Sequence, residues 1–272
     1  MTESSAYIHG SSPEEQARLE LMNGILNERC LAELDLRGGE RVLEMGAGTG
    51  VFSSDLLRVL GASGTLVAIE RDDEQVRAAR ERLAGRADLR SGDVGNPPLS
   101  ESEWGSFDLV HARFLLEHLP DPQGAVDVMV RAARAGGRIA LVDDDHSLMR
   151  FAPDPGGMTE LWRDYAERYR DLGCDPEVGR RLVSLLVNAG AEVERTTQIP
   201  YGGARGEPAF EAVVKNLAEV VDTGRAALLE RTDWTAARID DAQAAFRAWA
   251  ERADAVVWYA LPMAIGRRPK QR

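Results

Sequence analysis

The chain has 272 residues, of which 44% are apolar and 29% charged, so it can bury a large core without disulfides. Its 45 acidic and 33 basic residues give a net charge of −12, which argues against nucleic acid or an anionic membrane as the partner, because phosphates require a positive surface. There are two cysteines, no apolar run of membrane-spanning length and no signal-peptide pattern at the start, so we expect a cytoplasmic protein.

Strands and helices alternate over the first half of the chain. The first helix is expected over 13–34, where apolar residues recur at spacings of three and four. The segments that follow are strand 41–45, helix 51–61, strand 65–70, helix 72–85, strands 87–93 and 106–112, helix 122–137 and strand 137–143. This alternation predicts right-handed βαβ units and a parallel sheet covered on both faces.

The pattern loosens after residue 145. The expected elements are helices 156–171 and 176–189, strand 191–200, helices 207–230 and 235–252, and a final strand 255–267. Pro262 within that strand predicts an edge position or a bulge. Because no segment has the composition of a linker, we expect one domain with additions.

A glycine-rich turn, VLEMGAGTG (42–50), joins the first strand of the alternating region to its helix. Glycine permits positive φ and close approach of a ligand to the backbone. Val51 stands where a dinucleotide site has its third glycine, and no Lys-Ser/Thr pair follows, so the turn is not a phosphate-binding P-loop. Without its surroundings, the turn is equally compatible with a purely structural role.

Three acids strengthen the case for a ligand. Glu44 lies inside an apolar strand, Glu70 ends the second strand, and Asp93 follows the third. Ligands of open α/β sheets bind at the carboxyl ends of the strands, where an acid can accept both hydroxyls of a ribose. Glu70 is our candidate for that role, because Asp72 and Asp73 can serve as the cap of the next helix.

Five segments in order resemble the successive motifs of the class I S-adenosylmethionine-dependent methyltransferases. They are VLEMGAGTG, VAIERD, SGDV, FDLVHARFLLEHLPDP and GGRIALVD. The resemblance implies a Rossmann-like, mostly parallel α/β sheet of seven strands with the last strand antiparallel and helices on both faces. It also implies one methyltransferase domain over 1–272, with helical insertions that form a lid.

The expected parts of this domain are an N-terminal helical arm (1–36), a cofactor-binding core (37–145), acceptor-lid insertions (146–190 and 201–253) and the final strand (254–267).

The resemblance implies that a defined set of residues binds the cofactor S-adenosylmethionine. Glu44 and the glycine turn would contact the methionine part, Glu70 the ribose, and Asp93 the adenine amino group. His111 or Ala112 would line the methionine side. The N-terminal segment resembles a subgroup in which it folds over the cofactor, although a surface arm is an equal alternative. The full set is Tyr7, His9, Met22, Glu44, Gly46, Ala47, Gly48, Glu70, Arg71, Asp93, Val94, His111 and Ala112.

The predicted reaction is in-line methyl transfer to a small-molecule acceptor, mainly by positioning. His146, after the fifth strand, is the candidate base. We expect no metal at Asp143, Asp144 and Asp145, because three adjacent acids cannot all point one way. The oligomeric state stays open, with a homodimer as one option.

Three alternatives remain. They are a catalyst that binds S-adenosylmethionine without transferring its methyl group, an NAD-dependent oxidoreductase, and a methyltransferase with a macromolecular substrate.

Overall fold

The computed structural model describes residues 13–230 and 233–270, with side chains from residue 24 onward. These residues form two compact units. The sheet unit contains residues 26–144, 177–199 and the segment from 261 onward. The helical unit contains residues 13–25, 145–176 and 200–260. No helix among the described residues is both long and apolar enough to cross a bilayer.

The sheet unit is built on a seven-stranded sheet in the order β3-β2-β1-β4-β5-β10-β7. The strands are β1 (Arg41–Met45), β2 (Thr65–Glu70), β3 (Asp88–Ser91), β4 (Phe107–Arg113), β5 (Ala133–Val142), β7 (Glu192–Pro200) and β10 (Ala260–Arg267). Strands β3, β2, β1, β4 and β5 pair in parallel, whereas β10 is antiparallel to β5. This confirms the expected mostly parallel sheet with a reversed last strand.

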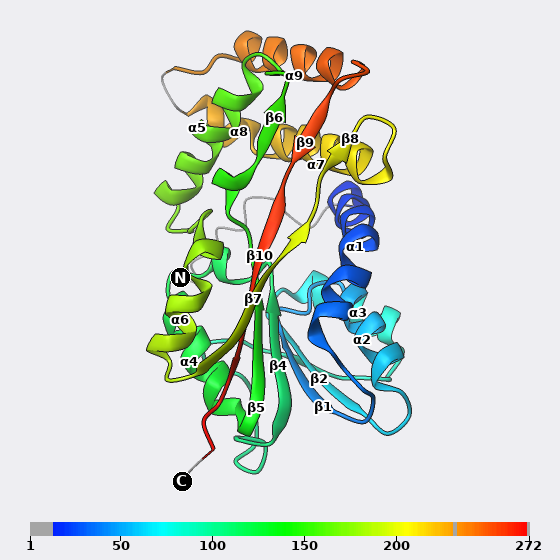
Figure 1. Cartoon of the computed structure of the whole chain (residues 1–272), viewed down its shortest axis with the longest axis vertical. Coiled ribbons are helices and arrows are strands. Elements are labelled where there is room, and N and C mark those ends of the chain that lie inside the picture. The colour runs from blue at the N-terminus through cyan, green and yellow to red at the C-terminus, as the bar shows by residue number, and fades with distance from the viewer. Residues whose placement is uncertain (1–12, 231–232, 271–272) are drawn as a thin grey trace. The chain divides into compact units, whose positions relative to one another are not determined.

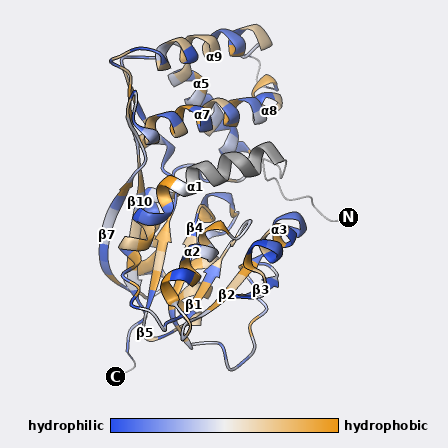
Figure 2. Cartoon of the chain, turned by 90° about the vertical axis from the view of Figure 1, so that its right-hand side faces the viewer, coloured by the Kyte–Doolittle hydropathy of each residue, from blue (hydrophilic) through white to orange (hydrophobic). Residues whose placement is uncertain are grey.

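Helices cover both faces of this sheet. They are α1 (Pro13–Leu34), α2 (Val51–Leu60), α3 (Asp73–Leu83), α4 (Pro122–Ala132) and α6 (Leu182–Asn188), with short 3-10 turns η1 (Leu116–His118) and η3 (Val178–Arg181). Helices α2 and α3 lie on one face and α4 and α6 on the other (Figure 1). Side chains alternate between the faces of a strand, so Leu43 and Val110 enter the core beneath α4 while Glu44 and His111 face α2. The strands of this sheet consist largely of hydrophobic residues, whereas α3 consists mostly of hydrophilic ones (Figure 2).

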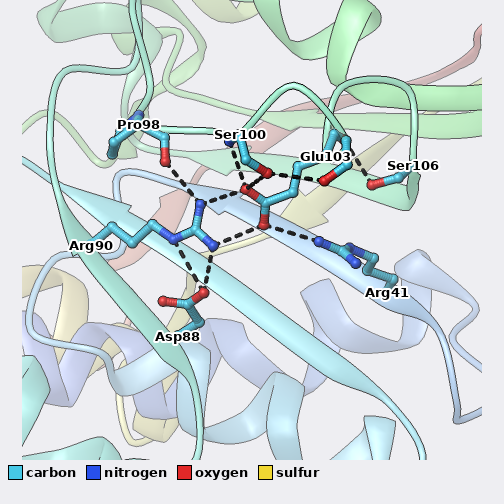
Figure 3. A network of polar contacts seen from close by, with 8 residues as sticks. Arg41, Asp88, Arg90, Pro98, Ser100, Glu103 and Ser106 are labelled. Carbon is cyan, nitrogen blue, oxygen red and sulfur yellow. Dashed lines mark hydrogen bonds and ion pairs between the residues drawn. The ribbon is translucent and has the colours of Figure 1, made fainter.

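A polar network anchors the connection between β3 and β4 to the sheet (Figure 3). The carboxylate of Glu103 accepts hydrogen bonds from both terminal nitrogens of Arg90, each at 2.8 Å, and from Arg41 Nη2 at 3.0 Å. It also accepts from the backbone and the hydroxyl of Ser100, at 2.8 and 2.9 Å. Arg90 in turn pairs with Asp88 on its own strand. The network fixes the far end of the connection that begins just after β3.

The helical unit has its own three-stranded sheet, in the order β6-β9-β8. Its strands are β6 (Arg150–Ala152), β8 (Gly203–Ala204) and β9 (Val256–Trp258). Its helices are α5 (Met158–Asp171), α7 (Pro208–Thr223), α8 (Arg225–Leu229), α9 (Ala236–Ala250) and the 3-10 turn η2 (His146–Leu148). Phe151, Phe246 and Trp249 pack ring against ring inside it, with centroids 5.4–5.8 Å apart.

Several predicted boundaries were wrong. The helix expected over 122–137 ends at Ala132, and β5 begins at Ala133. The helix expected over 207–230 divides into α7 and α8 at Gly224. No side chain fits at this position, since a Cβ there would lie 2.6 Å from the Tyr165 ring.

The final strand expected over 255–267 is two strands, β9 and β10, in different sheets. Pro262 lies in an interior strand rather than at an edge. It precedes the first registered pair with β5, Met263 with Val142, where a missing N–H is tolerated.

Residues 177–190 were expected within the first helical insertion but lie in the sheet unit, where Leu182 and Leu186 join its core.

Candidate functional site

The glycine turn uses the conformational freedom that its sequence predicts. Gly46, Gly48 and Gly50 have φ of 75°, 56° and 75°. The backbone N–H groups of Gly46 and Ala47 donate to the Ile69 carbonyl at 2.9 and 3.0 Å, which ties the turn to β2. Gly50 packs the start of α2 on α3, since a Cβ there would lie 3.2 Å from the Ala79 side chain. The third glycine therefore serves packing, while the first two form a half-buried bend.

Glu70 links the end of β2 to this turn. Its Oε2 accepts the backbone N–H of Gly48 at 2.9 Å, and its Oε1 accepts those of Arg71 and Asp72 at 2.8 and 3.0 Å. The helix cap is supplied by Asp72, which accepts two amides of α3, as expected. Oxygen Oε2 has a second lone pair, so Glu70 can accept a ligand hydroxyl while holding the turn.

The end of β3 lies beside Glu70, because the Gly92 N–H donates to the Glu70 carbonyl at 3.0 Å. Asp93 is exposed, and its Oδ1 accepts the Gly95 N–H at 2.7 Å. Its Oδ2 lies 4.0 Å from Arg71 Nη1, an ion pair largely screened by solvent. Val94 is buried in the core. The side chains of Arg71 and Asp93 are thus open to a ligand at this edge.

Glu44 and His111 form a buried polar pair beneath the turn. They are direct neighbours on β1 and β4, and Glu44 is 3% exposed and His111 1% exposed. The Ser53 hydroxyl donates to Glu44 Oε2 at 2.5 Å. Burial raises the pKa of Glu44 to about 7, opposed by the Ser53 bond and the charge of Arg113. Burial, aided by Arg113, lowers the pKa of His111 to about 3. The imidazole is therefore neutral.

Both ring nitrogens of His111 are without a hydrogen-bond partner among the described residues. Its ring packs on Phe52, with centroids 5.0 Å apart. A buried polar group without a partner is costly, so these nitrogens suit a ligand group or a water molecule. Ala112, the next residue, belongs to the core on the opposite face of the sheet.

Sequence reasoning missed two residues at this site. Ser53 lies in the first turn of α2, nine positions after the acid it binds, and that spacing alone gives no signal of the contact. Leu115 follows β4 and lies against the turn, where a Cβ on Gly46 would come within 3.0 Å of its Cδ1. A positive φ of 52° at Phe114 bends the chain there.

His146 belongs to the helical unit, whereas the residues above belong to the sheet unit. Its backbone N–H donates to the Pro176 carbonyl at 2.9 Å. Its ring packs on Trp162 and Tyr169, with centroids 5.0 and 6.2 Å away. Trp162, Tyr165 and Tyr169 share one buried face of α5. Of the N-terminal candidates, Tyr7, His9 and the Met22 side chain lie outside the described residues.

Known proteins that this chain resembles include several methyltransferases. Residues 43–139 match the model of a methyltransferase domain. The chain is 36% identical over 195 residues to a ubiquinone biosynthesis O-methyltransferase of Xanthomonas oryzae, a match that covers 68% of this chain and 76% of that protein. It is 32% identical over 172 residues to the 27-O-demethylrifamycin SV methyltransferase of Amycolatopsis mediterranei, covering 61% of this chain and 57% of that protein.

A solved structure of geranyl diphosphate C-methyltransferase from Streptomyces coelicolor, in complex with Mg²⁺, geranyl diphosphate and S-adenosyl-L-homocysteine, shares the fold. Its TM-score is 0.55 at 11% identity, over 98% of this chain and 86% of that one. The chain spans just under three fifths of the length of some curated relatives that it matches.

Proposed function

Because this chain belongs to the S-adenosylmethionine-dependent methyltransferases of class I, we propose that it transfers the methyl group of S-adenosylmethionine to a small-molecule acceptor. The observation that carries the proposal is the hydrogen bond from Gly48 to Glu70. It joins the glycine turn to the acid best placed to accept ribose hydroxyls, at the carboxyl ends of the parallel strands.

The residues present fit this ligand. Gly46 and Gly48 have positive φ and no side chain to block a ligand that approaches the backbone, and His111 has two buried nitrogens without a described partner. We assign the methionine part to Glu44, Gly46, Ala47, Gly48 and His111, with Ala112 supporting β4 from behind.

For the other half of the ligand, Glu70 would hold the ribose. Asp93 and Arg71 would meet the adenine, with Val94 beneath it. The N-terminal residues Tyr7, His9 and Met22 remain proposed cofactor contacts.

When bound, S-adenosylmethionine supplies an electrophilic methyl group on a positively charged sulfur. The protein must therefore mainly align the acceptor, and such alignment can contribute ~7–11 kcal/mol. The acceptor-binding residues would come from the two insertions of the catalytic domain, 146–176 and 201–253, without the residues 177–190 that belong to the sheet unit. His146 is the proposed base for an acceptor that must lose a proton, since an imidazole accepts protons near neutral pH.

The relatives suggest which acceptors to test first. One is named a 27-O-demethylrifamycin SV methyltransferase and the other an O-methyltransferase of ubiquinone biosynthesis, so hydroxylated aromatic compounds form the first panel. The protein would be incubated with S-adenosylmethionine labelled in the methyl group, with each acceptor and without any. We expect S-adenosylhomocysteine and a labelled product with at least one acceptor, and greatly reduced turnover in Glu70→Ala.

Two outcomes would change the assignment. The first is tight binding of S-adenosylmethionine with no methyl transfer to any acceptor, while an added substrate is converted to an unmethylated product. This outcome would favour a catalyst that binds S-adenosylmethionine without transferring its methyl group. Unchanged turnover in Glu70→Ala would show that the ribose is held elsewhere.

A further inference from the structure

Asp143, the first of three adjacent acids after β5, is fully buried (0% exposed). Its Oδ2 accepts the backbone N–H groups of Leu115 at 3.1 Å and Leu116 at 2.7 Å. Its Oδ1 accepts the N–H of Asp144 at 3.1 Å. Both oxygens are thus satisfied by main-chain donors, and two of these donors belong to the loop after the neighbouring strand β4. The carboxylate is a cross-strand anchor for that loop.

The anchored loop contains a strained residue. Phe114 has a φ of 52°, which is unusual for a bulky side chain. Its N–H donates to the Val142 carbonyl at 3.1 Å, and the next two N–H groups donate to Asp143. Backbone strain of this kind persists where surrounding contacts hold it, and such positions cluster at functional sites. Three consecutive hydrogen bonds to the end of β5 hold it here.

The same loop forms one side of the glycine turn. Leu115 follows Phe114, and a Cβ on Gly46 would lie 3.0 Å from Leu115 Cδ1 and 3.5 Å from its Cβ. Leu115 is therefore in direct contact with the first glycine of the turn. A shift of the loop would therefore change what packs against Gly46.

We propose that Asp143 is a positioning residue for cofactor binding, which acts by holding Leu115 against Gly46. The inference rests on the proposed function, because it takes the methionine part of S-adenosylmethionine to lie over the glycine turn. It also explains why an acid stands at this buried place in the sequence. The carboxylate contributes acceptors for the backbone, and the ligand feels it only through Leu115.

Four variants distinguish a role of Asp143 in positioning Leu115 from a role in the stability of the fold alone. Asp143→Ala removes the anchor, and Asp143→Asn keeps an oxygen that can accept from both Leu115 and Leu116. Leu115→Ala keeps the anchor and removes the contact. Asp108→Ala is the matched control, because Asp108 also accepts a backbone N–H, that of Arg41 at 2.8 Å, but at the opposite end of β4. S-adenosylhomocysteine affinity would be measured by calorimetry, and amide exchange of residues 114–118 by hydrogen–deuterium exchange without ligand.

We expect Asp143→Ala to weaken S-adenosylhomocysteine binding by about tenfold or more and to accelerate exchange at Leu115 and Leu116. Asp143→Asn should stay within about threefold of the wild-type affinity. Leu115→Ala should lose affinity with little change in exchange, and Asp108→Ala should bind as the wild type does.

Equal affinity losses in Asp143→Ala and Asp108→Ala would overturn the proposal, and so would unchanged exchange at Leu115 and Leu116. If Asp143→Ala does not fold, normal binding by Leu115→Ala would overturn it. A wild-type protein that does not bind S-adenosylhomocysteine would refute the proposed function instead, while the exchange data would still test whether Asp143 holds the loop.

Discussion

Glu103 offers a direct test of how the β3–β4 connection is held. Its side chain is 11% exposed and accepts from two arginines and Ser100 (Figure 3). The hydrogen bond with Arg90 is the main reason that the pKa of Glu103 falls from 4.5 to about 2. At about 1.4 kcal/mol for each unit of pKa, this lowering corresponds to at most about 3.5 kcal/mol of stability. Glu103→Gln should therefore lower the free energy of unfolding by about 2–3 kcal/mol at pH 7.

The contribution of Glu103 to the free energy of unfolding should depend on pH. An acid whose folded pKa is lowered stabilises the fold above its unfolded pKa, and this contribution disappears as pH falls through the folded value. The gap between wild type and Glu103→Gln should therefore narrow between pH 4.5 and 2. Urea unfolding at several pH values measures it, with Glu101→Gln as the control, because that neighbouring acid is exposed. A gap below about 0.5 kcal/mol at pH 7, or one that does not change with pH, would show that the contacts of the Glu103 carboxylate do not stabilise the fold.

Three further predictions concern the turn and its buried acid. Burial raises the pKa of Glu44 to about 7, so the stability of the fold falls as this carboxyl ionises with rising pH. Between pH 6 and 8, the free energy of unfolding of the wild type in urea should therefore fall by about 1.4 kcal/mol relative to that of Glu44→Gln. His111→Leu removes two buried nitrogens without described partners, so it should keep or raise the free energy of unfolding yet weaken S-adenosylhomocysteine binding about tenfold in calorimetry. Gly50→Ala meets Ala79 and Leu83 at a φ of 75° and should cost about 2–4 kcal/mol in urea unfolding, whereas Gly85→Ala, with similar φ and open space, should cost about 1–2.

Each of these has a clear counter-result. A difference between wild type and Glu44→Gln that is constant with pH would mean that Glu44 is already ionised at pH 6. Unchanged affinity in His111→Leu would remove His111 from the ligand site. Equal costs for the two glycine variants would show that strain, not the contact with α3, governs Gly50.

The sheet was predictable because its signals are local. Short apolar strands at 41–45 and 65–70 and their capped helices appear in the structure at or near the expected bounds. The division of 255–267 was not predictable, because β9 and β10 differ by the sheets they join rather than by their composition. Gly224 escaped notice for a similar reason, since the Tyr165 ring that requires it lies 59 positions earlier in the sequence.

The candidate site divides in the same way. Gly46, Glu70 and Asp93 were identifiable from their places at strand ends, where sequence order fixes position in a parallel sheet. Leu115 and Asp143 were not, because their roles depend on a contact between the loops after two different strands. Sequence patterns describe residues near one another along the chain, whereas these contacts arise only when β4 and β5 pair.

The proposed function requires that the glycine turn and Glu70 bind S-adenosylmethionine. Its most direct test is calorimetric titration of the purified protein with S-adenosylhomocysteine, with NAD titrated in parallel. We predict micromolar binding of S-adenosylhomocysteine, weakened about tenfold or more in Glu70→Ala, and no binding of NAD. Binding of NAD alone, or equal binding of S-adenosylhomocysteine by wild type and Glu70→Ala, would contradict the account.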